Sequence, residues 1–428
     1  MTQRQNKRGP RGRTPKPAAA WTGLTVMGVG LGIAAPVLVT PGFAQQQELR
    51  GQTVFERDRP EFDAKGIDAG GFVLFPTLSV TATYEDNIFA DEDDEESDTI
   101  IRTRPGIQAR SKWSRHELRA GADFRANSFL DNSEQDTAEY GADASLLLDI
   151  SRRANLRVGA AFDRLTVDRA DPEEAGREDP EELDQLRGNV VASYRFNRLG
   201  IAVEAKASDI SFVDELDEDS DRQEYEIAPK VSYEFSPALS GFVEPFYRVR
   251  DFDNDRDAGG IDRDSDVRGA FVGVSYDLTE ILYGDTSIGY FDTEFADDRF
   301  DNETGVSVRS RTTWNITPLT TLKGTVSREN LITNEPNSSS RTRFLVGAEA
   351  QHELRRNVLV GAKASFFQDD FTDDDREDDN LTFEATADYL VNRYASIAAS
   401  WDITDRDSSQ DGTSFTRNRF LIGIRTKF

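Results

Sequence analysis

The chain has 428 residues, two histidines and no cysteine, and its 79 acidic against 51 basic side chains give a formal net charge of −28. This charge argues against a nucleic-acid-binding surface, which needs clustered lysine and arginine, and the composition leaves little for thiol chemistry, structural zinc or a histidine-based triad. A mean hydropathy of −0.60 excludes a helical membrane protein, while 27 Phe, 11 Tyr and 4 Trp argue against disorder over most of the chain.

The first 44 residues are typical of a secretory signal peptide. Residues 1–17 are basic and rich in proline, and residues 18–40 are apolar and rich in alanine and glycine. Gly42 and Ala44 supply small residues at positions −3 and −1, so we expect cleavage between Ala44 and Gln45. An uncleaved membrane anchor is the alternative, and a proline inside the apolar stretch argues against it. Export by this route places the mature chain beyond the inner membrane of a bacterium.

A polar segment, residues 45–70, follows the signal peptide. We expect this segment to lie in the periplasm, or to enter the lumen of the domain that comes after it. From residue 71 to residue 428, segments of about 12–15 residues alternate apolar and polar side chains, which is the period of a β-strand. The clearest example is EYEIAPKVSYEF at 224–235.

Short connections, often containing arginine, alternate with long acidic loops throughout this region. Counting on this template predicts eighteen strands, with sixteen or twenty as alternatives. The expected strands are 72–88, 99–113, 117–129, 137–150, 155–168, 184–196, 200–213, 222–235, 239–252, 266–278, 282–295, 303–316, 319–332, 341–353, 357–371, 380–391, 394–406 and 415–428. The pattern indicates an all-β fold, an antiparallel up-and-down β-barrel. A propeller would need four short strands in each period of about 40 residues, and a β-helix would need short, regular rungs.

Further features favour a membrane-spanning barrel over a soluble sandwich, whose strands also alternate. The expected strands exceed the roughly five or six residues usual in sandwiches, and aromatic residues gather at both strand ends, like the two girdles of a membrane barrel. Short turns on one rim and long loops on the other match the asymmetry of outer-membrane barrels. The last strand alternates and ends in Phe428, which resembles the signal recognised by the barrel-assembly machinery.

The same pattern predicts orientation, location and partners. An even number of strands places both ends of the barrel on the short-turn rim, which we expect to face the periplasm. The acidic loops then face outward. The predicted location is the outer membrane of a Gram-negative cell, where the partners are membrane lipid, lipopolysaccharide and the assembly machinery.

Three short strings near the start of the predicted barrel carry a family resemblance: RPEFD at 59–63, GGFVLFP at 70–76 and YEDNIFA at 84–90. They are similar to the alphaproteobacterial outer-membrane proteins of the Putative beta-barrel porin 2 family. The resemblance implies an outer-membrane barrel. For some related barrels it implies exopolysaccharide secretion, with periplasmic polysaccharide-export proteins as partners. It supplies no catalytic residue and no cofactor.

The polar face of the strands predicts a charged lumen. The candidate lumen-lining residues are Arg102, Arg104, Arg110, Arg187, Arg195, Arg309, Arg311, Arg343, Glu224 and Glu226. One interpretation is that the arginines guide an anionic solute or polymer. The other is that opposite charges pair across strands and stiffen a hydrated wall, although exposed pairs contribute only about 0–1 kcal/mol each.

Other chemistry is weakly indicated. The acidic loops could bind Ca²⁺ or Mg²⁺, form a solvated fringe, or bridge to lipopolysaccharide through cations, but the loop at 251–266 lacks the spacing of a calcium-binding loop. His116 and His352 fall beside expected periplasmic turns, which disfavours an enzyme working in the outer leaflet. We therefore predict no catalytic, cofactor or metal site.

The sequence thus predicts an outer-membrane pore for hydrophilic solutes or polymers. Polysaccharide export is placed first because of the family, and a general diffusion porin or a closed structural or adhesive barrel are alternatives. Eighteen strands leave room for a water-filled bore. The loop at 251–266 is the expected constriction.

Overall fold

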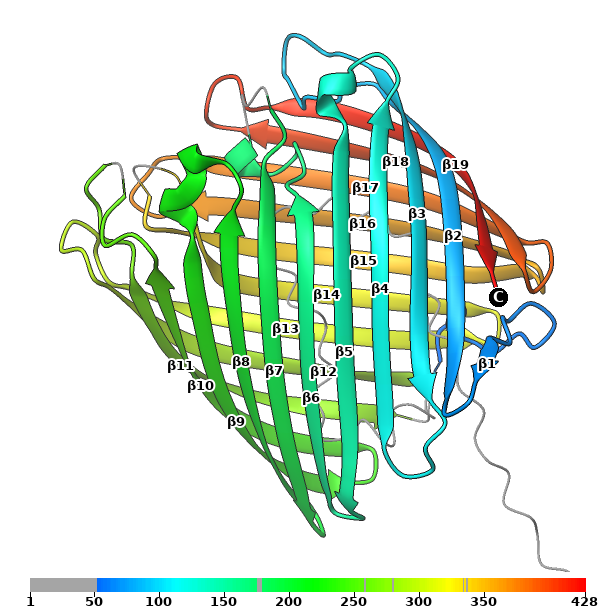
Figure 1. Ribbon diagram of the computed structural model, residues 1–428. Coiled ribbons are helices and arrows are strands. Elements are labelled where there is room, and N and C mark those ends of the chain that lie inside the picture. The colour runs from blue at the N-terminus through cyan, green and yellow to red at the C-terminus, as the bar shows by residue number, and fades with distance from the viewer. Residues whose placement is uncertain (1–51, 175–178, 258, 279–280, 334, 336–337) are drawn as a thin grey trace, which may run out of the picture.

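Eighteen antiparallel strands, β2 to β19, close into one barrel, and one additional short strand, β1, lies at its edge (Figure 1). The computed structural model describes residues 52–174, 179–257, 259–278, 281–333, 335 and 338–428. The strands are β1 (Ile67–Ala69), β2 (Phe72–Glu85), β3 (Asp98–Ser111), β4 (Glu117–Phe129), β5 (Thr137–Ser151), β6 (Ala154–Thr166), β7 (Glu182–Phe196), β8 (Leu199–Phe212), β9 (Arg222–Ser236), β10 (Leu239–Phe252), β11 (Ser265–Leu278), β12 (Leu282–Phe295), β13 (Glu303–Thr317), β14 (Thr320–Ile332), β15 (Ser340–Arg355), β16 (Val358–Phe371), β17 (Glu377–Leu390), β18 (Ala395–Ser408) and β19 (Phe415–Lys427).

The barrel closes where its last strand meets its first long strand. β19 pairs with β2 from Lys427 opposite Thr77 to Arg419 opposite Glu85. β1 pairs with the start of β2, beyond the point where β19 ends. The predicted fold class and strand number are confirmed, and the expected strand boundaries differ from the observed ones by at most three residues.

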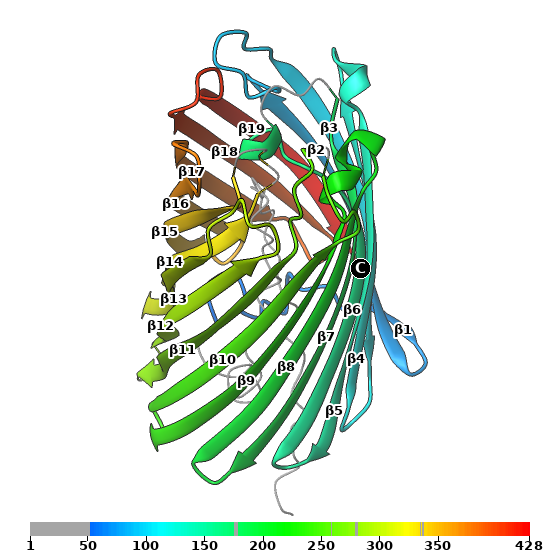
Figure 2. The same ribbon diagram turned by 90° about the vertical axis from the view of Figure 1, so that its left-hand side faces the viewer.

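The walls of the barrel place distant parts of the chain opposite one another. β4 to β8 form one wall and β14 to β18 form the other, as the two ribbon views agree (Figure 1, Figure 2). Short turns join the strands at one rim, where β2 starts and β19 ends, and the longer loops gather at the other rim. We call these rims the short-turn end and the loop end.

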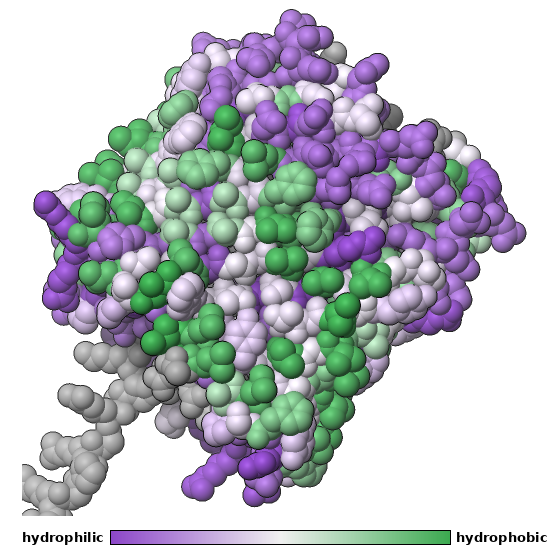
Figure 3. All heavy atoms as spheres, turned by 180° about the vertical axis from the view of Figure 1, so that it is seen from behind, coloured by the Kyte–Doolittle hydropathy of each residue, from purple (hydrophilic) through white to green (hydrophobic). Residues whose placement is uncertain are grey.

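Alternation along each strand sorts side chains between lumen and exterior. In β9, Tyr225, Ile227 and Val231 are each 47–48% exposed on the outer face, whereas the intervening Glu226 and Lys230 point inward and form ion pairs. Figure 3 shows hydrophobic side chains across the middle of one outer wall, with hydrophilic ones towards the loops. Such an extended exposed apolar belt suits contact with hydrocarbon, because soluble proteins rarely expose large apolar patches.

The described helices are three short 3₁₀ turns: η1 (Ser133–Gln135), η2 (Pro172–Glu174) and η3 (Glu215–Ser220). No helix in the described part of the chain is both long and apolar enough to cross a membrane.

Two small apolar clusters lie at opposite ends of the lumen. One, at the loop end, consists of Val167, Leu183, Ile210 and Phe212. The other, at the short-turn end, consists of Val54, Leu359 and Leu390, with Phe55 and Phe62 packed against it. Each cluster includes a residue from outside the long strands, so each marks a place where a connecting segment enters the barrel.

Candidate functional site

Residues 52–63, the lumen segment, lie inside the barrel at the short-turn end. The Val54 N–H donates to Thr321 Oγ1 at 3.1 Å, and the Phe55 N–H donates to Gln351 Oε1 at 3.1 Å. Both acceptors project inward from the wall. Of the two placements considered for residues 45–70, the described lumen segment therefore adopts the one within the barrel.

A buried charge fixes the fold of the lumen segment. Arg59, which is 4% exposed, donates through Nη2 to the Val54 carbonyl and to Glu353 Oε2, both at 2.8 Å. The Arg59 N–H donates to Asp63 Oδ2 at 2.6 Å, which closes a tight turn. Removing one partner of a buried ion pair is strongly destabilising, because the other charge is left without compensation. The segment is therefore anchored by charge as well as by apolar contact.

The wall is shaped to receive the ring of Phe55. A Cβ added at Gly361 would lie 2.7 Å from Thr386 Oγ1 and 3.2 Å from the Phe55 ring. Glycine leaves that space open. Val54 is fully buried against Leu359 and Leu390, so the inner wall offers an apolar contact where the lumen segment docks.

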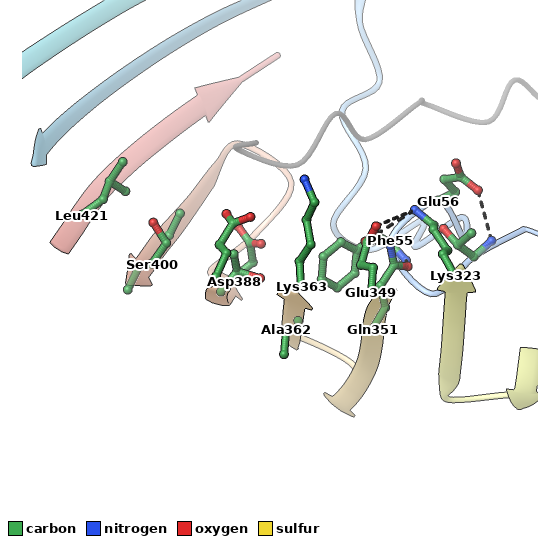
Figure 4. A pocket seen from close by; sticks show the side chains of 16 residues that line it. Phe55, Glu56, Lys323, Glu349, Gln351, Ala362, Lys363, Asp388, Ser400 and Leu421 are labelled. Atoms are coloured by element: carbon green, nitrogen blue, oxygen red, sulfur yellow. Dashed lines mark hydrogen bonds and ion pairs between the residues drawn. The ribbon is translucent and has the colours of Figure 1, made fainter. Parts of the chain in front are cut away.

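A cavity of about 210 Å³ remains between the lumen segment and the wall (Figure 4). Its charged lining consists of Glu56, Lys323, Glu349, Lys363, Glu384 and Asp388. Lys323 Nζ and a Glu349 oxygen are 3.4 Å apart, and Gln351 also donates to Glu349 at 2.5 Å. The lining combines apolar side chains with charged side chains of both signs, which suits a hydrated passage.

At the loop end, residues 167–172 cross the lumen, and we call them the crossing loop. They leave β6 on one wall and contact arginines on the other wall and on the adjoining strand β19. Asp168 Oδ1 accepts from Arg417 Nη1 at 3.0 Å, and its Oδ2 lies 3.7 Å from Arg419 Nη1. Asp171 lies 3.8 Å from Arg341, and both side chains are fully buried.

Backbone carbonyls complete the docking of the crossing loop. The Ala170 carbonyl accepts from Arg406, and the Pro172 carbonyl accepts from Arg376 Nη2 at 3.1 Å. Because β6 and the strands from β15 to β19 belong to different walls, these contacts span the barrel mouth.

The loop at 251–266, expected to form the constriction, packs elsewhere. Arg263 donates to the carbonyls of Thr333 at 3.0 Å, Glu335 at 3.0 Å and Ser338 at 3.3 Å, all between β14 and β15. This loop therefore bridges neighbouring loops on the rim, and the segment that crosses the lumen is 167–172. Both loops are acidic, so composition alone could not show which of them crosses the lumen. That depends on which loop faces arginines across the barrel.

The ten predicted lumen residues lie on the inward face of their strands, mostly beside a partner. Arg311 lies opposite Asp285 in the strand register. The partners of the other nine are Asn127 for Arg102 (2.6 Å), Asp123 for Arg104 (2.8 Å), Glu117 for Arg110 (2.6 Å), Asp163 for Arg187, Glu234 for Arg195, Glu329 for Arg309 (3.8 Å), Asp369 for Arg343 (2.5 Å), Arg222 for Glu224 (3.1 Å) and Arg248 for Glu226 (2.5 Å). The geometry favours cross-strand pairing for these residues, and a role in guiding solutes stays a prediction.

The remaining predicted sites have simple surroundings. His116 Nδ1 accepts from the Asp149 N–H at 3.2 Å, and His352 Nδ1 lies 3.0 Å from Thr320 Oγ1, both near the short-turn end. The Phe428 N–H donates to the Pro76 carbonyl at 3.2 Å. Within the described residues, no group of three or more histidines and acids is arranged to hold a metal ion. The predicted cleavage site, Ala44 and Gln45, lies outside the described residues.

Sequence reasoning missed the crossing loop and its arginines. Asp168 and Asp171 sit in one of several acidic loops, and nothing in their local sequence distinguishes them. The arginines that the crossing loop contacts are easier to find in the sequence. They recur at the loop-end termini of the last strands, at positions 341, 376, 406, 417 and 419. An acidic loop facing them could have been expected, but not which one.

The chain was compared with family profiles, with solved structures and with curated proteins. The sequence profile of the Putative beta-barrel porin 2 family matches residues 59–428. Among solved structures, the outer-membrane protein OpdK of Pseudomonas aeruginosa is similar with a TM-score of 0.48 and 10% identity over 83% of this chain and 99% of OpdK. OccAB4 of Acinetobacter baumannii gives 0.45 and 12% over 84% and 99% of the two chains. The siderophore receptor PirA of Pseudomonas aeruginosa gives 0.44 and 9% over 87% and 81%. No curated protein matches the chain in sequence.

Proposed function

Since this chain belongs to the Putative beta-barrel porin 2 family, we propose that it is an outer-membrane channel for small hydrophilic solutes. The observation that carries the proposal is a closed barrel with a charged inner wall, an apolar outer belt and two segments that enter its lumen. A barrel of this size has a bore wide enough for water. The lumen segment and the crossing loop narrow that bore from opposite ends and control passage through it.

The inserted segments favour small solutes over polymers. A polymer in transit would need the lumen segment and the crossing loop to leave their anchors together, at the cost of two buried charge contacts. A small solute needs only the space beside them, such as the polar cavity next to Phe55. Polysaccharide export, which the family first suggested, becomes an outcome of the test rather than the preferred function.

Planar-bilayer recording of the full chain tests the proposal, with Val54→Asp as the informative variant. The new carboxylate would be buried against Leu359 and Leu390, so the lumen segment should detach. Losing the burial of Val54 alone costs about 1.5–3 kcal/mol. We expect the native chain to conduct small ions weakly and the variant to conduct strongly. Ile67→Asp, at an exposed position of β1, is the control and should match the native chain.

The other functions make different predictions in the same recording. A closed structural or adhesive barrel conducts in neither form. A polysaccharide exporter conducts little in the native form and yields a pore that long uncharged dextrans enter once Val54→Asp is introduced. Release of fatty acid from added phospholipid would identify an enzyme. Each of these results contradicts the proposal of a small-solute channel.

A further inference from the structure

The crossing loop covers a concentration of buried arginines, which we call the loop-end arginine cluster. Its members are Arg341, Arg376, Arg406, Arg417 and Arg419. Each of these five arginines is at most 7% exposed. They come from β15, β18, β19 and the residue before β17, so the cluster forms one patch on a single wall. Keeping this many guanidinium groups out of water requires anionic or carbonyl partners.

The crossing loop meets the cluster almost entirely through oxygen atoms. Carboxylates of Asp168 and Asp171 and carbonyls of Ala170 and Pro172 all face arginine donors. Four residues between positions 168 and 172 thus present the cluster with a row of oxygens. Such a row resembles what a small, oxygen-rich anion would offer to the same donors.

The wall supplies further carboxylates, and these already pair with some of the arginines in the cluster. Arg419 pairs with Asp402 at 2.8 Å, and Arg376 pairs with Asp378 at 2.9 Å and also with Glu335. These arginines are held by the barrel itself, whether or not the crossing loop is present. They set the shape of the patch rather than its capacity for a ligand.

Arg417 is different, because its donors are only partly used. Its Nη1 serves both Asp168 at 3.0 Å and Glu85 at 3.3 Å, while its Nε and Nη2 have no hydrogen-bond partner among the described residues. The side chain is 3% exposed. Arginine binds carboxylates best through two parallel N–H donors, a geometry that Asp168 does not achieve here. A free carboxylate, not tethered to a loop, could use the donors that Asp168 leaves idle.

We infer that the loop-end arginine cluster is a binding site for small carboxylate anions, centred on Arg417, and that Asp168 occupies it in this state as an internal stand-in. The inference rests on the proposed channel function, since it names the class of solute that the channel recognises. A solute carboxylate takes the place of Asp168 on Arg417 and frees the crossing loop. Entry of the solute thus displaces the loop, and the bound solute itself occupies the passage beside Arg417.

Block of chloride current by succinate tests the inference on the full chain in planar bilayers. In Asp168→Asn the internal competitor loses its charge, so the succinate concentration for half block should fall about tenfold. In Arg417→Gln it should rise about tenfold, for loss of a charge-assisted donor pair. Arg417→Lys keeps the charge without the paired donors and should lie between Gln and the native residue.

Matched controls separate the site from general lumen electrostatics. Arg104→Gln and Asp123→Asn alter another inward ion pair, 2.8 Å apart, on β3 and β4. These two control variants should leave both half block by succinate and the uptake of glucose into liposomes unchanged from the native chain. Circular dichroism of each purified variant establishes that the barrel has formed, and if Asp168→Asn does not assemble, the two Arg417 variants decide the question.

The outcomes distinguish this inference from the proposed function. Succinate block that is equal in the native chain and in the Asp168 and Arg417 variants would overturn the carboxylate site while leaving the channel intact. A change of the same size in the Arg104 control would overturn it too, because general electrostatics would then explain the effect. A native chain that passes neither chloride nor glucose would overturn the channel itself.

Discussion

The two ends of the lumen are occupied by different means. At the short-turn end, the lumen segment is anchored by the apolar contact of Val54 and by one buried ion pair, Arg59 with Glu353. At the loop end, the crossing loop is held by arginines that meet carboxylates and carbonyls. The short-turn end thus combines apolar packing with one ion pair, whereas the loop end relies on several contacts between arginines and oxygen atoms.

This difference implies that the ends respond to different agents. Apolar contact is insensitive to ions, and the Arg59–Glu353 pair, whose side chains are 5% and 15% exposed, is screened less by salt than an exposed pair. The loop end instead depends on carboxylates that a proton or a competing anion can replace. We therefore expect the short-turn end to yield to mechanical or partner-driven displacement, and the loop end to respond to the composition of the medium.

The largest expected effect follows from breaking the buried ion pair of the lumen segment. Arg59→Met leaves Glu353 without its partner and should weaken docking by about 3–5 kcal/mol. A nitroxide attached to Asp58→Cys reports the release as increased mobility, and the native chain has no cysteine to interfere.

The control for this prediction is a pair on the same segment. Arg356 and Glu61 form an ion pair with side chains 73% and 54% exposed, so Glu61→Ala should change docking by only about 0–1 kcal/mol. Equal label mobility in the Arg59 and Glu61 variants would show that burial does not govern the anchor.

A smaller effect is expected from filling the space beside Phe55. Gly361→Ala places a methyl group 2.7 Å from Thr386 and 3.2 Å from the Phe55 ring, which should weaken docking by about 1–3 kcal/mol. The mobility of a nitroxide at Asp58→Cys measures this weakening of docking. Gly324→Ala is the matched control, since its added methyl group meets no atom within 4 Å. Unchanged mobility in Gly361→Ala would mean that the ring does not sit as described.

The smallest effect at neutral pH concerns the loop end, which should open in acid when no competing anion is present. Burial alone would raise the pKa of Asp168, but Arg417 and Arg419 outweigh burial and hold the pKa at about 2. A carboxyl whose pKa is lowered on docking stabilises the docked state at higher pH and loses this contribution as pH falls through that value. A nitroxide at Ala170→Cys should therefore stay immobile from pH 7 to pH 5 and gain mobility between about pH 4 and pH 2.

Asp168→Asn in the Ala170→Cys background provides the control for the acid response. Without the ionisable group, mobility should already be raised at pH 7 and should vary little on acidification. Mobility that rises between pH 7 and pH 5 in the parent would assign the response to another group.

The sequence carried nearly all the information about the barrel wall. For strands 117–129, 239–252 and 282–295, the predicted first and last residues equal the observed ones. The alternation of side chains and the turn that follows are local properties of the sequence, so they can be read from it directly. The inward placement of charged residues follows from the same alternation. The family string at 59–63 also fell within the region that the family profile matches.

What fills the lumen could not be predicted in the same way. The hydrogen bonds that seat Val54 and Phe55 join residues 267 and 296 positions apart in the chain. The choice between loops 167–172 and 251–266 depends on which wall each loop faces once the barrel has closed. Such contacts depend on the closed shape of the barrel and leave no periodic trace in the sequence.

The most direct test is the single-channel conductance of the full chain compared with a variant in which residues 52–63 are deleted. Because the lumen segment lies against the inner wall, we predict that its deletion increases conductance severalfold while the barrel remains closed by circular dichroism. Equal conductance in the two proteins would contradict the claim that this segment narrows the passage.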